Sequence, residues 1–590
     1  MPHFLRRVIR RGKLLLPVAL IALTFGYVAP VYAHALLLRA NPPQDALLKQ
    51  SPSIIHLWFS ENLNPGASKI IVWNRYRHTV SLGQAKVVPG QPKQMEVHVQ
   101  KLPAGTYLVL WTSVSAVDGH ILHGFYLFSV KVRGPGPSLS GVSESTSQGF
   151  PDAPTLASLL AHWLELLAAV TWTGAVFFLA WVLRPQKEPL DEGTWATARR
   201  LAGRLTAGSL IVLFLASLAL VIVELYTYAG NSWSQAFTGT TVREVFGVQY
   251  GQLWLARQGM VLIALAAVLV PARSIPRATR QSLLVVLGLV YLYIFAASGH
   301  AAASQIGDVG GTNIISAGVF VDWIHYLADA AWFGGQIFIV LVLIPALALR
   351  RSPVHTGAFL RTLDRFSPLA YASVAGYIVS GIFAAKIHIP SWYAFFQSVY
   401  GRTLIVKVVL IGLMMLVSVT TVFLIRPRIR HTMRVGGEDV TRVSAFLMQR
   451  LLNLLRVNPL LGVGVLLATS VLYYYPVPVG FAPAGPSGYT AHSGGLTATL
   501  SITPDKSGPN TITVLLKNKQ GKPVKQASVR VLTNMLQMVM GQGLAALQEK
   551  APGRFSGTTD LGMGGKWRLT ILVYEPAAYV QMNVDVEVGS

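Results

Sequence analysis

The sequence predicts a multi-domain membrane protein. An all-β N-terminal domain of Ig-like sandwich or barrel type is followed by an eight-helix transmembrane domain with a parallel internal repeat, and then by an all-β sandwich. Two patterns lead to this fold class: eight long apolar segments occupy the middle of the chain, and strand-like alternation occupies both flanks. The composition agrees, because 52% of the residues are hydrophobic and only 12% are charged, which gives a mean hydropathy of +0.49.

The amino-acid content excludes several classes of site and partner. The 590 residues include no cysteine, so disulfides, zinc–thiolate sites, iron–sulfur clusters and thiolate copper sites are ruled out. Any metal must be held by His, Asp, Glu, Met or backbone groups. The net charge of +25 would suit nucleic-acid binding, but the basic residues fall mostly in short segments beside the apolar stretches. Membrane topology and targeting explain this charge, and no nucleic-acid partner is expected.

Residues 1–33 have the order of features of a secretory signal peptide. Basic residues come first, an apolar stretch covers 14–29, and the segment ends with Val31-Tyr32-Ala33. Cleavage after Ala33 would make His34 the N-terminus of the exported chain.

The remaining chain divides into three predicted domains. We expect a β domain at 34–133, a linker at 134–153, a transmembrane domain at 154–476, a linker at 477–495 and a final β domain at 496–590. The linkers are rich in Gly, Pro and Ser. Apolar and polar residues alternate along the first domain, as in strands with one buried face. The strands expected there are 54–60, 69–74, 94–99, 106–114 and 125–132.

Eight segments are long and apolar enough to cross a membrane, which takes about 20 residues. The loops after the first, third, fifth and seventh segments are rich in Lys and Arg, whereas the alternate loops contain only Arg243 and Arg402. The positive-inside rule places the basic loops in the cytoplasm. We therefore expect a multi-pass protein of the cytoplasmic membrane with both terminal domains on the extracytoplasmic side. The expected spans are 155–183, 204–228, 252–271, 281–299, 315–348, 366–388, 403–425 and 458–475.

Spans 1–3 read as a duplicate of spans 5–7 in the same orientation, which predicts a parallel repeat. The segment His162-Trp163-Leu164-Glu165 matches Asp322-Trp323-Ile324-His325 at an offset of 160 residues. Trp and Gly also recur at helix crossings for packing reasons alone. The other matched pairs are Trp172 with Trp332, Gly174 with Gly334, Arg204 with Arg365, Tyr250 with Tyr400 and Arg257 with Lys407.

A metal site is expected where the new N-terminus meets Asp118-Gly119-His120 at a strand end. His34 would supply its α-amine and its imidazole, His120 a second imidazole, and Asp118 an axial or outer oxygen. One amine, two imidazoles and a carboxylate suit Cu(II) in a tetragonal field. An Asp-Gly turn alone is common in hairpins, so the prediction depends on a cleavage site that directly precedes a histidine.

Ionisable side chains within apolar spans are costly and usually face a partner or a pathway. His162 and His325 are expected at similar depth in the outer half of the membrane, each with an acidic residue three positions away on the same helix face. We expect these groups to line a copper path, although some could instead snorkel or cap helices. The candidates are His162, Glu165, His300, Asp322, His325 and His388.

Motifs in all three domains carry a family resemblance. His34-Ala35, Asn41-Pro42, Phe59-Ser60-Glu61 and the stretch from Trp111 to Phe128 resemble the CopC family of copper-binding proteins. The membrane segments resemble CopD through Ser298-Gly299-His300-Ala301, Trp332 to Gly335, Arg365-Phe366-Ser367 and Tyr400-Gly401-Arg402. The C-terminal unit is similar to YtkA-like domains through Gly553-Arg554-Phe555-Ser556-Gly557 and Gly562 to Trp567.

The chain thus resembles a CopC–CopD fusion with a YtkA-like tail, which implies copper handling. Within the CopC-like domain we expect Glu61 to orient a copper ligand through a hydrogen bond. Some CopC proteins also carry a methionine-rich Cu(I) site, but only Met95 lies between His34 and His120, so none is expected here. Thioethers prefer Cu(I), although Met also fills cores. The C-terminal Cu(I) candidates are Met535, Met538, Met540 and Met563.

We expect the protein to bind Cu(II) outside the cytoplasmic membrane and to carry copper across it, with uptake as the favoured direction. Its partners would be the copper ion, the lipid bilayer and an extracytoplasmic copper donor. No catalytic residues and no P-loop are found, so neither an enzyme nor an ATP-driven pump is expected. Two alternatives stay open. One is a haem-binding membrane electron-transfer protein or cupric reductase, and the other is a non-transporting copper buffer that serves resistance.

Overall fold

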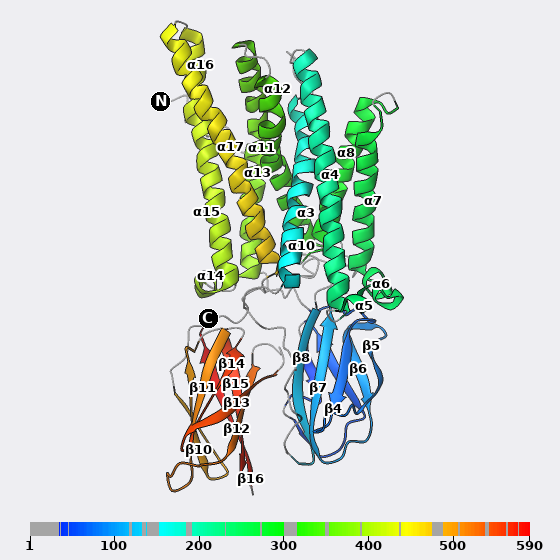
Figure 1. Ribbon diagram of the computed structural model, residues 1–590, viewed down its shortest axis with the longest axis vertical. Coiled ribbons are helices and arrows are strands. Elements are labelled where there is room, and N and C mark those ends of the chain that lie inside the picture. The colour runs from blue at the N-terminus through cyan, green and yellow to red at the C-terminus, as the bar shows by residue number, and fades with distance from the viewer. Residues whose placement is uncertain are drawn as a thin grey trace.

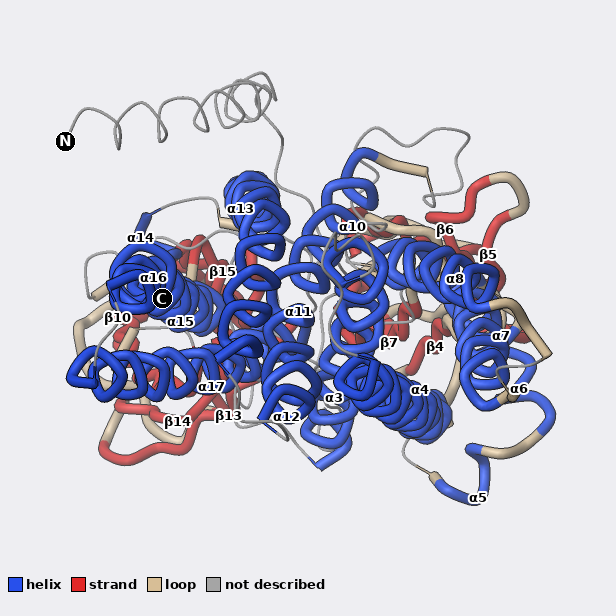
Figure 2. Tube along the Cα trace, turned by 90° about the horizontal axis from the view of Figure 1, so that it is seen from above, coloured by secondary structure: helices blue, strands red, loops and turns tan. Residues whose placement is uncertain are grey.

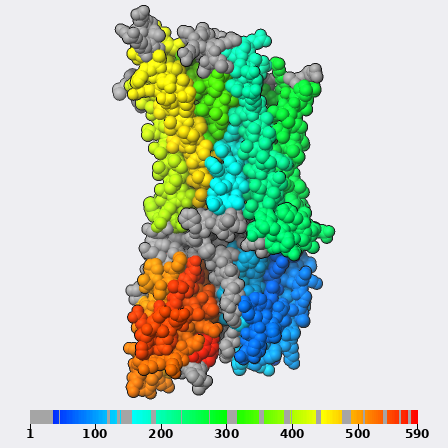
Figure 3. Space-filling view, viewed as in Figure 1, coloured from blue at the N-terminus to red at the C-terminus, as the bar shows by residue number. Residues whose placement is uncertain are grey.

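The computed structural model places a bundle of long helices at one end and two β domains side by side at the other (Figure 1). Both β domains therefore lie at the same end of the bundle (Figure 3), as an even number of spans requires. The structure describes residues 35, 37–44, 46–116, 121–132, 137, 153–183, 192–229, 232–271, 274–299, 315–348, 353–389, 392–435, 438–474, 488–505, 508–536, 542–561, 564–575 and 578–589.

The first β domain is a sandwich of two four-stranded sheets, with strand orders β1-β3-β6-β5 and β2-β8-β7-β4. The predicted sandwich is confirmed. Alternation determines which face is buried: on β3, Ile55, Leu57 and Phe59 point into the core while the residues between them are half-buried. The strands are β1 (Leu37–Asn41), β2 (Leu47–Leu48), β3 (Ile54–Phe59), β4 (Lys69–Trp73), β5 (Ser81–Val88), β6 (Gln91–Val99), β7 (Gly105–Val114) and β8 (Ile121–Val130).

Trp111 organises the core of this sandwich. Its ring meets Phe59 edge to face, with ring centroids 5.6 Å apart, which is a favourable aromatic geometry. Gly124 on β8 is the register partner of Trp111 on β7. A Cβ atom at position 124 would lie 2.3 Å from Trp111 Cζ2, so the indole occupies the space that only glycine leaves free.

Eight helices are long and apolar enough to cross a membrane, which confirms the predicted number of spans among the residues that the structure describes. The second helix begins at Glu192 and the eighth span at Ala445, well before the predicted limits of 204 and 458. These extensions carry Arg199, Arg200 and Arg450, because a helix continues beyond the apolar segment that hydropathy detects.

The membrane domain consists of the following helical elements. They are α3 (Ala153–Phe177), η1 (Phe178–Leu183), α4 (Glu192–Tyr228), α5 (Trp233–Ala236), α6 (Gly239–Phe246), α7 (Gln249–Leu269), α8 (Arg277–Ala297), α10 (Ala317–Asp329), η2 (Ala330–Gly334), α11 (Gly335–Phe338), η3 (Ile339–Leu343), α12 (Ile344–Ala348), α13 (Pro353–His388), α14 (Trp392–Gln397), α15 (Val399–Val419), η4 (Thr420–Ile425), α16 (Arg426–Val435) and α17 (Glu438–Tyr474).

Viewed along the bundle, α3 and α11 lie in the middle, with α4, α7 and α8 on one side and α13, α15 and α17 on the other (Figure 2). The two central spans touch through glycines. A Cβ atom on Gly174 would lie 2.3 Å from the Ala330 carbonyl oxygen, and one on Gly334 would lie 2.3 Å from the Val170 carbonyl oxygen. Small residues let membrane helices approach this closely, so the first and fifth spans form the centre of the bundle.

The C-terminal β domain is one eight-stranded sheet with the order β16-β15-β12-β13-β14-β11-β10-β9. The predicted two-sheet sandwich is therefore wrong here. The sheet curls until its edge strands approach, and the Glu587 backbone N–H donates to Tyr489 Oη at 3.3 Å. Near closure leaves little of the sheet edge exposed. The strands are β9 (Tyr489–Ser493), β10 (Leu496–Thr503), β11 (Gly508–Lys517), β12 (Ser528–Met535), β13 (Gln542–Ala551), β14 (Arg554–Leu561), β15 (Gly565–Glu575) and β16 (Ala578–Val588).

The interior of this barrel is apolar and its outside is partly charged. Val529, Val531 and Ile571 are among its fully buried side chains. On the outside, Arg568 donates two hydrogen bonds to Asp585, at 2.7 and 2.8 Å. These bonds hold the pKa of the Asp585 carboxyl below its ordinary value.

The two β domains share an apolar interface. Leu108 and Leu127 from the first domain and Leu532 and Leu572 from the barrel are all buried in one cluster, together with Phe125. On β7 and β8 these residues lie on the face opposite the sandwich core, so this sheet is apolar on both faces. Sheets covered on both sides have such continuous apolar strands, and the two β domains therefore pack as a single unit.

Replacing Leu127 by Asp is expected to separate the β domains. A buried Leu contributes about 1.5–3 kcal/mol, and a carboxylate in its place would lack a partner. We expect faster hydrogen exchange in β12 and β15 while the sandwich core stays protected. The control is Leu82→Asp, because Leu82 on β5 is 54% exposed. Unchanged exchange in the barrel strands would contradict the interface.

Candidate functional site

The segments that lead to the predicted N-terminal ligands converge on Glu61. Ser115 Oγ donates to Glu61 Oε2 at 2.7 Å, and both side chains are buried. Ser113 Oγ donates to the Ala35 carbonyl at 2.7 Å, and the Ala116 N–H donates to the Asn62 carbonyl at 2.8 Å. Ala35 directly follows His34, and Ala116 precedes Asp118 by two residues. The chain on both sides of the predicted site is thus anchored at one end of the sandwich.

The predicted ligands His34, Asp118 and His120 lie outside the described residues. Their coordination geometry therefore stays a prediction. Glu61 is described, and it is 1% exposed. A carboxylate that is buried in this way is fixed in orientation by its hydrogen bonds, as a group that positions a metal ligand must be.

This end of the sandwich rests on the membrane domain. Asn64 Nδ2 donates to the Glu244 carbonyl of α6 at 3.1 Å. A Cβ atom on Gly66 would lie 2.8 Å from Glu244 Cγ. Asn64 and Gly66 follow Glu61 within five residues, so the predicted copper end of the first domain faces the helical bundle.

His162 lies in a buried aromatic pocket between the first and eighth spans. Its Nδ1 is 3.2 Å from Ser470 Oγ of α17. The imidazole stacks on Tyr473 with centroids 4.3 Å apart and an interplanar angle of 15°, and it also faces Phe295 at 5.8 Å. The ring is thus fixed by contacts from two other spans.

Glu165, one helical turn deeper on α3, forms a buried ion pair. Arg257 Nη1 of α7 donates to Glu165 Oε1 at 3.2 Å, and Tyr291 Oη of α8 donates to the same oxygen at 3.2 Å. The exposed fractions are 1% for Glu165, 4% for Arg257 and 0% for Tyr291. This network links three spans, so the carboxylate proposed for the copper path already has two strong partners.

His325 has similar surroundings in the second half of the domain. Its Nδ1 is 2.7 Å from Ser380 Oγ of α13, and its ring stacks on Tyr377 with centroids 4.1 Å apart. Lys407 Nζ of α15 lies over the same tyrosine, 5.7 Å from the ring centroid. His162 and His325 thus each contact a serine hydroxyl and a tyrosine ring.

Few of the remaining candidates are described. Asp322 is half-buried on α10. His388 is the last residue of α13, and its side chain is outside the described set, as are His300, Met538, Met540 and Met563. Met535 is 2% exposed inside the barrel core, where its thioether packs against apolar side chains.

Within the described residues, no group of three or more His, Asp or Glu side chains is placed to hold a metal ion. His162 contacts Ser470 and Tyr473, whereas His325 contacts Ser380 and Tyr377, so the two histidines lie in separate pockets.

Sequence reasoning missed several of these partners. Arg257 and Lys407 entered the sequence comparison only as repeat markers, although a cation inside an apolar span is itself a signal. Ser380 and Ser470 gave no signal, because serine is common at membrane helix contacts.

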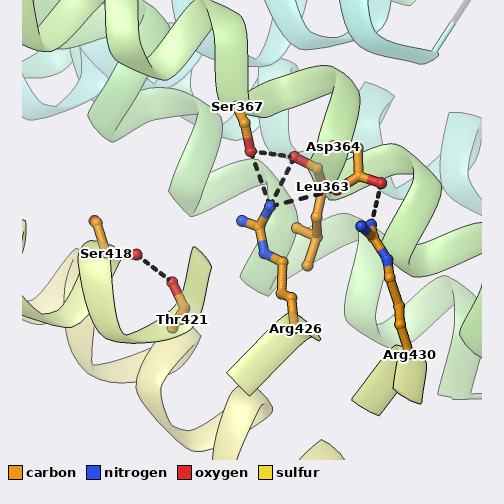
Figure 4. A network of polar contacts seen from close by, with 7 residues as sticks. All are labelled: Leu363, Asp364, Ser367, Ser418, Thr421, Arg426 and Arg430. Atoms are coloured by element: carbon orange, nitrogen blue, oxygen red, sulfur yellow. Dashed lines mark hydrogen bonds and ion pairs between the residues drawn. The ribbon is translucent and has the colours of Figure 1, made fainter. Parts of the chain in front are cut away.

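A further buried cation lies at the opposite end of the bundle from the β domains. Arg426 Nη1 donates to the Leu363 carbonyl at 3.2 Å and to Ser367 Oγ at 2.8 Å, and it lies 3.9 Å from Asp364 (Figure 4). Arg430 forms an ion pair with the same carboxylate. The network joins α13 to α16 and accounts structurally for some of the basic residues at this end.

Four family models together match most of the chain. Residues 37–131 match the CopC domain, and 153–310 match the N-terminal domain of copper resistance protein D-like proteins. Residues 360–472 match copper resistance protein D, and 490–572 match the YtkA-like domain. The chain belongs to the copper-handling family of CopC–CopD fusion proteins and carries a YtkA-like C-terminal domain.

Individual relatives agree with this assignment. The chain is 26% identical over 551 residues to the copper transport protein CutJ of Bacillus subtilis (strain 168), a match that covers 92% of this chain and 93% of CutJ. Protein YobA of Escherichia coli (strain K12) is 38% identical over 115 residues, which is 19% of this chain and 92% of YobA. The inner membrane protein YebZ of the same strain is 26% identical over 204 residues, or 34% of this chain and 64% of YebZ.

Proposed function

We propose that this protein binds Cu(II) outside the cytoplasmic membrane and transports copper across it into the cytoplasm. The observation that carries the proposal is the contact between the Glu61 end of the first domain and the membrane domain, through Asn64 and Glu244. An ion bound beside Glu61 would be released against the helical bundle rather than into bulk solvent. The similarity to CutJ, a copper transport protein, supports the same reading.

The proposed capture site uses groups from both ends of the first domain. His34 gives its amine and ring nitrogen after signal-peptide cleavage, His120 gives a second ring nitrogen, and Asp118 gives an oxygen. Glu61 orients this set through hydrogen bonding, which is the usual role of a carboxylate beside metal ligands. The anchoring of Ala35 and Ala116 on either side of Glu61 supports this assembly.

The proposed orientation places both β domains outside. The helix ends away from the β domains carry Arg426 and Arg430 in the described network, and basic residues of membrane proteins favour the cytoplasmic side. Under this orientation the Glu61 site faces the extracytoplasmic medium and the arginine network faces the cytoplasm.

Within the membrane we propose that copper passes the pockets of His162 and His325. The two halves of the domain would be parallel repeats, a reading supported by the reciprocal contact of Gly174 and Gly334 at the centre of the bundle. Each imidazole has Nδ1 beside a serine hydroxyl, which fixes the orientation of the ring in its pocket.

Replacing Gly66 by Trp is expected to reduce copper uptake at least about tenfold while Cu(II) binding by the first domain persists. The added side chain would collide with Glu244 and displace the domain from α6. A misplacement of ~1 Å between reacting groups can lower the rate of a step about 100-fold. We expect the displaced domain to transfer copper more slowly for the same reason. Uptake is measured as cytoplasmic copper in cells that produce each variant.

The matched control is His78→Trp, because His78 is exposed in the turn between β4 and β5. Normal uptake by the Gly66 variant would contradict direct hand-over. Cells that lack the protein separate transport from buffering: unchanged cytoplasmic copper would favour the buffer. A Soret band in the purified protein would favour the haem alternative.

A further inference from the structure

A small cavity lies inside the membrane domain between the fifth, sixth, seventh and eighth spans. Asp329 and Trp332 line it from the fifth span, Tyr377 from the sixth, Met414 from the seventh and Gly462 from the eighth. Its volume is about 10 Å³, which is the space of one water molecule or one ion. The cavity shares no lining residue with the His162 pocket. Its lining residues Trp332, Phe333 and Met414 belong to the packed core of the helical bundle.

Asp329 brings a carboxyl group to this cavity. Its exposed fraction is 6%, and within the described part of the chain it makes neither a hydrogen bond nor an ion pair closer than 4.0 Å. A buried carboxylate without such partners is costly in an apolar span. Lys407 attracts it from the seventh span, but the Lys407 ammonium lies over the Tyr377 ring. The carboxylate therefore faces the cavity with its hydrogen-bonding capacity unused.

Met414 brings a soft ligand to the same cavity. It is 2% exposed, and it lines the same cavity as Asp329. Thioether sulfur prefers Cu(I) among the available metal ions. The chain has no cysteine, so methionine is its only sulfur ligand.

Charge also favours a monovalent ion. With one carboxylate at the cavity and the Lys407 ammonium nearby, Cu(I) leaves less uncompensated positive charge in the low-dielectric interior than Cu(II) does. Uncompensated charge is expensive there.

The backbone beside Asp329 forms one of the four π-helical segments among the described residues. Asp329 ends α10, and the next five residues, Ala330–Gly334, form a π-helical turn. Such turns occur frequently at functional sites. The widened turn lets Asp329 and Trp332 both reach the cavity.

We propose that Asp329 and Met414 form a transit site that holds copper as Cu(I) in the membrane. This inference rests on the proposed copper transport and names a site on its path. It differs from the histidine pockets, because its ligands are a carboxylate and a thioether.

The test is an anaerobic Cu(I) titration of the full-length protein in detergent, against the chromogenic chelator bicinchoninate. Met414→Leu removes the sulfur with little change in volume, and we expect it to bind one equivalent fewer than the wild type. Asp329→Asn should lose the same equivalent. Met415→Leu is the matched control, since Met415 is adjacent and does not line the cavity.

X-ray absorption on the loaded protein gives a second readout, because every copper–sulfur contact must come from methionine. Copper–sulfur scattering should fall in Met414→Leu and persist in Met415→Leu. Full Cu(I) stoichiometry in Met414→Leu would overturn the site. Loss of one equivalent in Asp329→Asn but not in Met414→Leu would also overturn the site, because the bound ion would then not depend on the thioether of Met414.

Transport assays separate failure of the site from failure of the proposed function. Uptake by Met414→Leu should fall at least tenfold while the Cu(II) affinity of the first domain is unchanged. A lost equivalent with normal uptake would remove the site from the path. If the wild-type protein carries no copper, the proposed function fails, whereas the stoichiometry still decides whether the site exists.

Discussion

One residue inserted between Ala33 and His34 is expected to weaken Cu(II) binding by the exported protein about 100-fold or more, since losing even a supporting group commonly costs 10–100-fold. In the proposed site the free amine and the imidazole of His34 belong to the same residue and close one chelate ring. The insertion moves the amine away from the imidazole and leaves a peptide nitrogen in its place. The measurement is a Cu(II) titration of the purified full chain against a competing chelator.

The insertion needs two controls. N-terminal sequencing must show that cleavage still follows Ala33, so that His34 is preceded by one residue only. His78→Ala removes an exposed histidine of the same domain and should leave the affinity unchanged. Equal affinity of the inserted and wild-type proteins would show that the amine is not a ligand, and the proposed capture site would fall.

The membrane spans could be predicted from the sequence because the bilayer imposes one simple requirement, a long apolar segment. All eight predicted spans correspond to helices in the structure. The sandwich was predictable for a similar reason, since burial of one face imposes alternation on strands such as β3. In both cases the signal lies within a single element.

Features that depend on two elements were harder to predict. Closure of the C-terminal sheet depends on how far eight strands curl together. The apolar pattern of a single strand does not indicate that curvature. The interface between the β domains does have a signal in the sequence, because Leu108 and Leu110 interrupt the expected alternation of apolar and polar residues on β7. The partners of the membrane histidines come from spans far away in sequence, such as Ser470 for His162.

The two halves of the membrane domain arrange acid, histidine and cation differently. In the first half the order is His162 then Glu165, and Glu165 pairs with Arg257. In the second half the order is reversed, so His325 stands where the predicted repeat would place a carboxylate. Lys407, which the predicted repeat matches to Arg257, lies over Tyr377 and forms no ion pair with a described residue. The first half thus holds a closed charge pair, and the second keeps a carboxylate, Asp329, available to a cation.

Replacing Arg257 by Met is expected to destabilise the protein by about 3–5 kcal/mol, the usual cost of removing one partner from a buried ion pair. Glu165 would keep its hydrogen bond from Tyr291 but lose its counter-charge in an apolar interior. The measurement is denaturant or thermal unfolding of the purified protein in detergent. Arg243→Met serves as the control, because Arg243 is exposed on α6 and surface changes usually stay within about 0.5 kcal/mol.

The double variant Glu165→Leu with Arg257→Met decides what the pair is for. Apolar replacement of a whole buried ion pair is often neutral or stabilising, so we expect the double variant to recover most of the lost stability. If uptake recovers as well, the pair is structural and Glu165 does not belong to the copper path. If stability returns while uptake stays low, Glu165 acts on the ion itself, because the fold that the pair supported would then be intact.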